Sequence, residues 1–160
     1  MKMTMTPTKT KSNQLPPNPF VHEVLELAGK QRSKAKKAEI LQQYRSDALT
    51  TILIWNFDDT VISVVPEGEV PYKENEVPVG TDHTSLRREY KHLYNFVKGG
   101  NDSLSAIRRE TMFIQMLEGL HPEEAKILCL VKDKALSTKY KLTYDVVAMA
   151  YPDIQWGGRS

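Results

Sequence analysis

Apolar residues recur every three or four positions along most of this 160-residue chain, with glycine, proline or capping residues between the runs. That spacing lines one face of an α-helix, and such a face must be buried against other helices. The runs predict helices from Phe20 to Gly29, through Ile40 to Tyr44, from Ala48 to Phe57, from Thr84 or Ser85 to Val97, from Ser103 to Leu117, from Pro122 to Val131 and from Thr143 to Ala150. We therefore expect an all-α fold, a compact bundle of about six helices.

The segments outside these runs set the domain limits. Residues 1–19 are polar, basic and rich in proline, which favours a disordered arm. Residues 20–154 form a single helical domain, long enough to bury a core of its own. Within it, residues 62–83 predict a long acidic loop punctuated by proline and glycine, with short β-pairing near Val61 as its only strand signal. Residues 155–160 form a tail, and its Trp156 could fold back on the body.

The formal net charge of +2 conceals blocks of opposite sign. Residues 1–48 carry nine Lys or Arg against four Asp or Glu, residues 49–82 carry one against seven, and residues 83–160 carry twelve against nine. Segregated charge sets local potential and hence partner choice. The single cysteine, Cys129, excludes an internal disulfide and lies on an apolar helix face. No apolar run is long enough to span a bilayer, so we expect no membrane partner and a cytoplasmic location.

The densest charge lies between the first two predicted helices, where residues 30–37 hold five cations in eight positions. Ser33 is placed to cap the second of these helices. Other basic groups lie on the predicted helices after residue 84 and in the last helix-to-helix connection. Lys and Arg beside helix starts bind phosphate oxygens, although each group alone also fits an ordinary solvated surface. The candidate nucleic-acid-binding residues are Lys30, Arg32, Ser33, Lys34, Lys36, Lys37, Arg108, Arg109, Lys139 and Lys141.

The sequence shows no catalytic constellation. Its four histidines lack metal-ligand spacing, and it has neither a G-x-x-x-x-G-K nor a G-x-G-x-x-G phosphate loop. Asp58 and Asp59 could contribute to a divalent cation site, but nothing nearby completes one, so a solvated pair ending a helix is the favoured interpretation. Trp55 is expected in the core. We expect no metal, no cofactor and no enzymatic activity.

Two stretches resemble the N-terminal α-helical DNA-binding domain of phage-type ATP-dependent DNA ligases. One is Val24 to Trp55, with a helix, a basic Ser-Lys hinge, Ile40-Leu41 and an apolar third helix. The other runs from Glu124 through the Lys132–Leu136 stretch to a proline-containing exit at residues 151–154. The order of elements agrees over residues 20–154. The whole chain is also similar to small uncharacterised proteins of large tailed phages of marine bacteria.

The departures from the ligase pattern limit what the resemblance implies. The nucleotidyl-transfer motif Lys-x-Asp-Gly is absent, and Lys139-Tyr140 stand where these ligases carry a glycine near the DNA backbone. The resemblance therefore implies a non-catalytic accessory protein that holds duplex DNA by its phosphates, in replication or repair, with a sliding clamp as a further possible partner. The alternative is an adaptor that binds a host or phage enzyme through the acidic loop and the tail.

Overall fold

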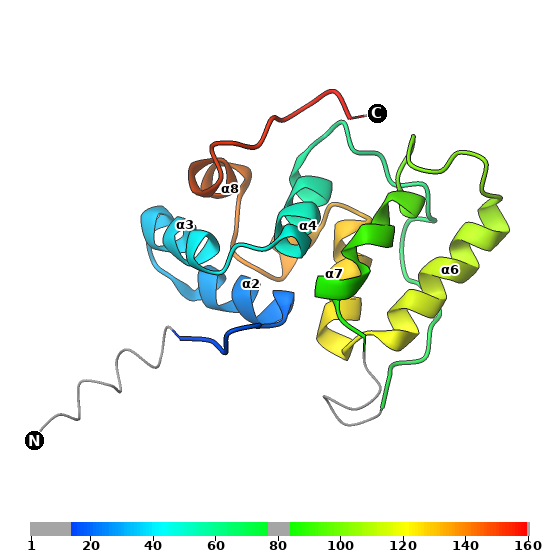
Figure 1. Cartoon of the computed structure of the whole chain (residues 1–160), viewed down its shortest axis with the longest axis horizontal. Helices are drawn as coiled ribbons and strands as arrows, with labels where there is room; N and C mark the ends of the chain where they lie inside the picture. The colour runs from blue at the N-terminus through cyan, green and yellow to red at the C-terminus, as the bar shows by residue number, and fades with distance from the viewer. Residues whose placement is uncertain (1–13, 77–83, 160) are drawn as a thin grey trace, which may run out of the picture.

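The computed structural model describes residues 14–76 and 84–159, and helices dominate them (Figure 1). The α-helices and two 3₁₀ segments follow in the order α2 (Val21–Lys30), α3 (Lys34–Gln43), α4 (Asp47–Phe57), α5 (Leu86–Glu89), η1 (Tyr90–Phe96), α6 (Ala106–Gly119), α7 (Pro122–Val131), η2 (Leu136–Thr138) and α8 (Tyr144–Ala150). Within these ranges β-pairing is limited to two isolated bridges, so the all-α prediction is confirmed. Most of the predicted arm (1–13) and the end of the predicted acidic loop (77–83) lie outside the described residues.

Helices from both ends of the chain form one end of the molecule, where α3 packs against α2 and α8 (Figure 1). Their facing sides bury Leu25, Leu41 and Val147 completely. Tyr151, which follows α8, is also fully buried, and its hydroxyl donates to the carbonyl of Leu41 at 2.7 Å. The C-terminal segment is therefore part of the core that supports the basic segment between α2 and α3.

The other end of the molecule is built by α6, which packs against α7 and η1 (Figure 1). Phe96 of η1 meets Phe113 of α6 edge-on, with ring centroids 5.0 Å apart. Helix α4 contacts α5, η1 and α7, and both Ile52 and Leu53 are fully buried. This central helix joins the two ends into one hydrophobic core, in which Trp55 lies as predicted.

A buried carboxylate connects the starts of two helices across this core. Glu124, in the first turn of α7, is fully buried. Its Oε2 accepts from the backbone N–H of Val21 at 2.9 Å, and its Oε1 accepts from that of Leu86 at 2.9 Å. Burial raises the pKa of this carboxyl, while the two N–H donors favour its charged form. One side chain thus satisfies unpaired N–H groups of both α2 and α5.

Serine residues set where several helices begin. Ser33 accepts from the N–H of Lys36 at 3.1 Å, so its predicted role as the N-cap of α3 is confirmed. The cap of α4 is Ser46, two residues before the predicted start at Ala48, and the cap of α6 is Ser105, two residues after the predicted start at Ser103. These shifts of two residues leave the predicted helices in place.

The helix predicted from residue 84 to Val97 is wrong in form. Only α5 is α-helical, and the chain continues as the 3₁₀ segment η1. Asn95 is buried and donates to the carbonyl of His92 at 2.9 Å, which gives the backbone a local partner outside an α-helical ladder. Gly100 then folds back so closely that a Cβ there would lie 1.8 Å from the carbonyl oxygen of Tyr94. Only glycine fits this return.

The described part of the predicted acidic loop lies against the body. Ser63 forms an isolated antiparallel bridge with Val97, which is the extent of the β-pairing near Val61. Further along, the backbone N–H of Lys73 donates to Glu118 of α6 at 2.8 Å. Residues 62–76 therefore follow the surface of the second half of the molecule.

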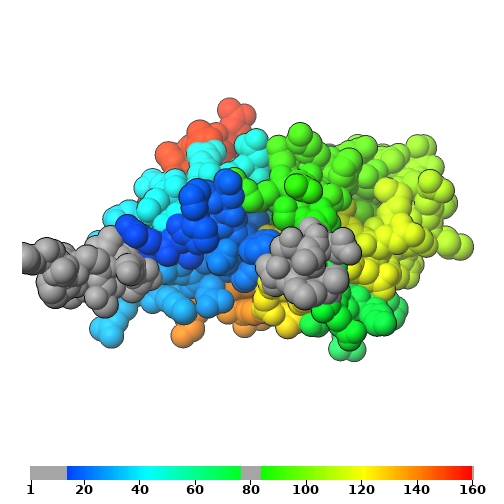
Figure 2. Space-filling view, turned by 60° about the horizontal axis from the view of Figure 1, so that its bottom comes forward, coloured from blue at the N-terminus to red at the C-terminus, as the bar shows by residue number. Residues whose placement is uncertain are grey.

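The segment before α2 is also placed on the body. The backbone N–H of Leu15 donates to the hydroxyl of Tyr44 at 2.9 Å, and Asn18 accepts from Arg87 at 3.4 Å. Figure 2 shows this dark blue segment between the cyan helices and the green α5 region. Residues 14–19 of the predicted arm therefore have hydrogen-bond partners on two elements of the body.

Candidate nucleic-acid interface

The end of α2, the start of α3 and the segment after η2 meet around an open groove of about 550 Å³. Five cations and one carboxylate line it. The lining residues are Glu26, Gly29, Lys30, Gln31, Arg32, Lys37, Lys139, Tyr140 and Lys141. The fold thus brings the basic segment at residues 30–37 together with the predicted cations near residue 140, which lie more than a hundred positions later in the chain. We call this site the basic groove.

A close approach of two backbones forms the floor of the basic groove. A Cβ on Gly29 would lie 3.2 Å from the backbone nitrogen of Lys141, so the small residue lets α2 touch the later segment. Lys37 fastens the same junction, because its ammonium donates to the carbonyl of Gly29 at 3.4 Å and to the carbonyl of Lys141. Lys37 is therefore a positioning residue, whose charge is partly used within the protein. Gly29 was predicted only as a helix stop, and α2 continues to Lys30.

Three of the five lining cations form no ion pair with a described residue, and one of them, Lys37, already donates to two backbone carbonyls. Arg32 and Lys141 are exposed and have no carboxylate partner among the described residues. Lys30 instead pairs with Glu26 at 3.4 Å, between two exposed side chains. Exposed ion pairs of this kind contribute little stability, so the lysine can readily exchange its carboxylate partner for another anion. Arg32, Lys141 and Lys30 are therefore available to phosphate oxygens.

Lys139 is held by a carboxylate from α7. Glu123 accepts from Lys139 at 2.8 Å and from Lys126 at 3.0 Å. These hydrogen bonds lower the pKa of Glu123 to about 2, so the carboxylate stays charged throughout the neutral range. Glu123 competes with any phosphate for Lys139. Pattern reasoning missed this residue, whose position in the first turn of α7 indicated only a helix-dipole contact.

The first turn of α3 adds two exposed lysines beside the groove. Lys34 forms an ion pair with Asp145 of α8, and Lys36 lies 4.0 Å from Glu39. The pair with Lys34 lowers the pKa of Asp145 to about 2. This turn holds no acidic residue. Cations are unfavourable at the positive end of a helix dipole, so an anion bound here would relieve the repulsion. Ser33 is occupied as the N-cap.

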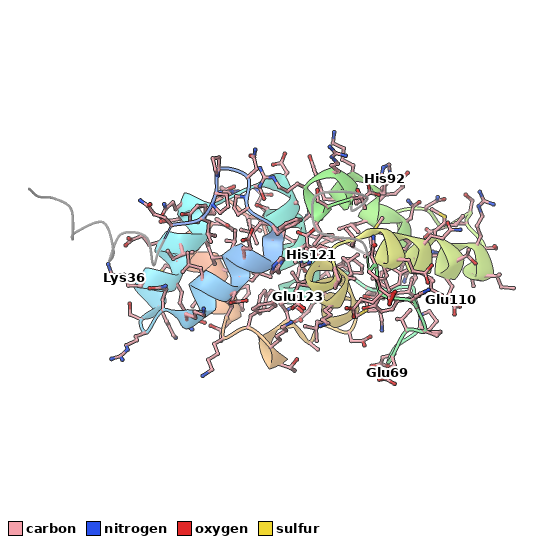
Figure 3. The ribbon with its side chains drawn as sticks, turned by 90° about the horizontal axis from the view of Figure 1, so that it is seen from below. Lys36, Glu69, His92, Glu110, His121 and Glu123 are labelled. Carbon is pink, nitrogen blue, oxygen red and sulfur yellow. The ribbon has the colours of Figure 1, made fainter. Side chains whose placement is uncertain are left out.

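The predicted arginines of α6 are not part of this site. Figure 3 places Lys36 of α3 at one end of the molecule and Glu110 of α6 towards the other. Arg108 is exposed on α6, far from the groove. Arg109 is only 9% exposed, and its guanidinium donates to the carbonyls of Asn95, Asn101 and Leu104 at 2.9–3.1 Å. Arg109 therefore holds the turn before α6 and is not placed to bind phosphate.

Two lysines of the last basic stretch are also used internally. Lys132 has a fully buried side chain, and it donates to the carbonyl of Gly68 at 2.7 Å and to Asp133. Lys134 donates to the carbonyls of Trp55 and Asp58 at the end of α4. Burial lowers the pKa of Lys134. Of this stretch, only Lys139 and Lys141 reach the groove.

The carboxylate pair after α4 divides between two environments, and the prediction of a solvated pair is wrong for Asp58. Its side chain is 2% exposed and accepts from Thr60, from the N–H of Gly157 at 2.9 Å and from Arg159 at 2.8 Å. Asp59 remains exposed. In the part of the chain that the structure describes, no three potential metal ligands gather at one place.

The hydrogen bonds that Asp58 accepts from Gly157 and Arg159 hold the C-terminal tail against the body. Beside them, Trp156 meets Tyr144 of α8 edge-on at 5.0 Å, so the prediction that it folds back on the body is confirmed. The indole is therefore partly buried within this chain. A partner that docks on it, as the adaptor hypothesis requires, would have to compete with these internal contacts.

Comparison with known proteins identifies the family. A model of a family of unknown function, DUF6433, matches residues 24–138. The chain belongs to this family. The match begins within α2, includes α3 and the basic segment between the two helices, and ends just before Lys139. No curated protein and no solved structure matches the chain. No helix in the described ranges has the length and apolar character that a bilayer crossing requires.

Proposed function

We propose that this protein is a non-catalytic accessory factor that binds duplex DNA through the phosphate backbone, with the basic groove as its contact. The observation that carries the proposal is the convergence of two distant basic segments on one open groove that only one carboxylate lines. Exposed Arg32 and Lys141 would contact phosphates directly, with Lys30 beside them. The resemblance of residues 20–154 to a ligase DNA-binding domain supports the same contact.

The groove is suited to a backbone and not to a sequence. Its charged donors are Lys and Arg side chains beside Gly29 and Tyr140, and the one amide side chain that lines it, Gln31, already donates to the carbonyl of Leu27 at 3.0 Å. We therefore expect weak sequence preference. If about four phosphates are neutralised, the affinity should fall roughly 100-fold between about 50 and about 200 mM salt.

The test is fluorescence anisotropy with a labelled duplex over a series of salt concentrations. The double variant Arg32→Ala/Lys141→Ala removes two exposed cations without touching the core. It should weaken binding and reduce the slope of log affinity against log salt by about two. Arg108→Ala is the matched control, because it removes an exposed cation on the remote helix α6. The proposal fails if the double variant binds like wild type, or if Arg108→Ala weakens binding as much.

The adaptor hypothesis remains the second candidate. Residues 62–76 and the tail both contact the body, through Lys73 and Glu118 in one case and through Gly157 and Asp58 in the other. A partner enzyme would thus bind the acidic segment in the conformation in which the body holds it. Substituting exposed Glu67 and Glu69 with Gln should abolish any such complex and leave duplex binding unchanged.

A further inference from the structure

A second cavity lies between α4 and η1, outside the basic groove. It has a volume of about 290 Å³. Its walls combine apolar residues of α4, of η1 and of the segment after α4. The apolar and aromatic lining residues are Ile54, Trp55, Val61, Tyr90, Leu93, Tyr94 and Val97. We call it the η1 pocket.

The η1 pocket and the basic groove face different sides of the molecule. In Figure 3, the green segment that carries His92 of η1 lies along the upper edge. The orange segment of η2, which leads to Lys139 and Lys141, lies along the lower edge. A straight duplex held in the groove would not reach the pocket, so the pocket requires an occupant of its own.

The floor and the rim of the pocket differ in exposure. Trp55 and Leu93 at its base are 3% and 2% exposed, respectively, whereas Tyr94 at its edge is 51% exposed. A large aromatic side chain left in solvent beside an open apolar hollow is typical of a protein-binding site. The apolar lining residues other than the tyrosines and Trp55 are aliphatic, which suits an inserted apolar side chain better than a stacked base.

The charge around the pocket is positive. Lys91 and Arg159 line it together with the apolar residues, and no carboxylate does. Arg88 lies three positions before Lys91 on the same helical segment, and both are exposed without a carboxylate partner among the described residues. Two acids contact the lining residues: Asp58 accepts from Arg159 at 2.8 Å, and Asp47 accepts from the hydroxyl of Tyr90 at 3.3 Å. Lys91 and Arg88 therefore carry the free positive charge at this rim. An acidic segment would therefore be attracted to this rim.

We propose that the η1 pocket docks an acidic segment of a partner protein, with one bulky apolar side chain inserted against Tyr94 and Ile54. Carboxylates on either side of that anchor would face Lys91 and Arg88. This inference goes beyond DNA binding, and it places a protein interface on the side opposite the basic groove. It differs from the adaptor hypothesis, which places the contact on the acidic segment and the tail.

The test is selection from a random peptide library displayed against the immobilised full chain. Selected peptides should share a bulky apolar residue flanked by Asp or Glu. A synthetic peptide of that consensus should bind wild type and lose about tenfold in affinity with Tyr94→Ala, as expected for a buried anchor. Lys91→Glu should weaken it similarly. Ile107→Ala and Arg108→Glu are matched controls, because they change an exposed apolar residue and an exposed cation on α6.

Three outcomes would overturn this proposal. The first is a consensus without acidic residues, and the second is peptide binding that survives Tyr94→Ala. The third is single-stranded oligothymidylate that binds in a Tyr94-dependent manner while no peptide does, which would assign the pocket to nucleobases. Each leaves the duplex-binding test unaffected, because Arg32 and Lys141 are unchanged in every variant. The two proposals can therefore fail separately.

Discussion

Replacing Asp58 with Asn should destabilise the fold by about 2–3 kcal/mol. The buried carboxylate accepts four hydrogen bonds: two from Thr60, one from Gly157 and one from Arg159. An Asn side chain keeps one acceptor oxygen and presents an NH₂ group to the other donors, so two bonds are lost. A hydrogen bond to a charged group contributes about 1.5–3 kcal/mol, and the partly exposed Arg159 contributes less because solvent screens it.

Urea unfolding followed by circular dichroism measures this cost, and the neighbouring residue supplies the control. Asp59→Asn removes the same charge from an exposed position and should change stability by less than about 0.5 kcal/mol. Deleting residues 157–160 removes the donors of two of these hydrogen bonds, the N–H of Gly157 and the guanidinium of Arg159. In the Asp58→Asn background the deletion should therefore cost much less than it does in wild type.

The pH dependence gives an independent check on Asp58. Burial alone would raise its pKa, but hydrogen bonds from Thr60, Gly157 and Arg159 outweigh it and hold the pKa well below the ordinary value of 3.8. The stabilisation is therefore complete above the unfolded-state pKa and is lost as pH falls through the folded-state value. The difference between wild type and Asp58→Asn should be constant from about pH 7 to about pH 5 and shrink below about pH 4. Equal stability of the two proteins at neutral pH would refute the reasoning.

Three further outcomes follow from contacts at the helix ends. Glu124→Gln leaves one of the N–H groups of Val21 and Leu86 without its acceptor, and urea unfolding should show a cost of about 1–3 kcal/mol. Arg109→Ala removes the donor from three carbonyls and should lower the thermal midpoint by several degrees, while the folded variant binds duplex DNA like wild type. Glu123→Gln releases Lys139 and should strengthen duplex binding by about two- to fivefold in anisotropy, whereas Glu118→Gln on α6 should not.

The helices could be predicted from the sequence because they depend on local information. Ser33 lies at a position where a hydroxyl caps the following turn, and the apolar spacing through Leu25 and Leu41 reflects the buried face directly. The segment around Asn95 could not be predicted in the same way. Its 3₁₀ geometry depends on Arg109, which is fourteen positions away, and on the return of the chain at Gly100. No periodicity in the segment itself carries that information.

The candidate site could be predicted only in part, because local charge density can be read from a sequence and burial cannot. Charge density located Lys30 and Arg32, but it could not show that Arg109 is buried. Both arginines look alike in a sequence, and only the tertiary fold decides which one faces solvent. The meeting of Gly29 with Lys141 likewise results from the packing of α3 against α8, which joins the two ends of the chain.

The two hydrogen bonds accepted by Glu124 have a consequence for cooperativity. Because one buried side chain holds the first turns of α2 and α5, neither end of the molecule can open without exposing an unpaired carboxylate in the other. The amide protons of Val21 and Leu86 should therefore exchange with solvent only when the whole domain unfolds, with equal free energies of opening and the same dependence on denaturant. The groove and the pocket would then belong to a single unfolding unit, although they face different sides of the protein.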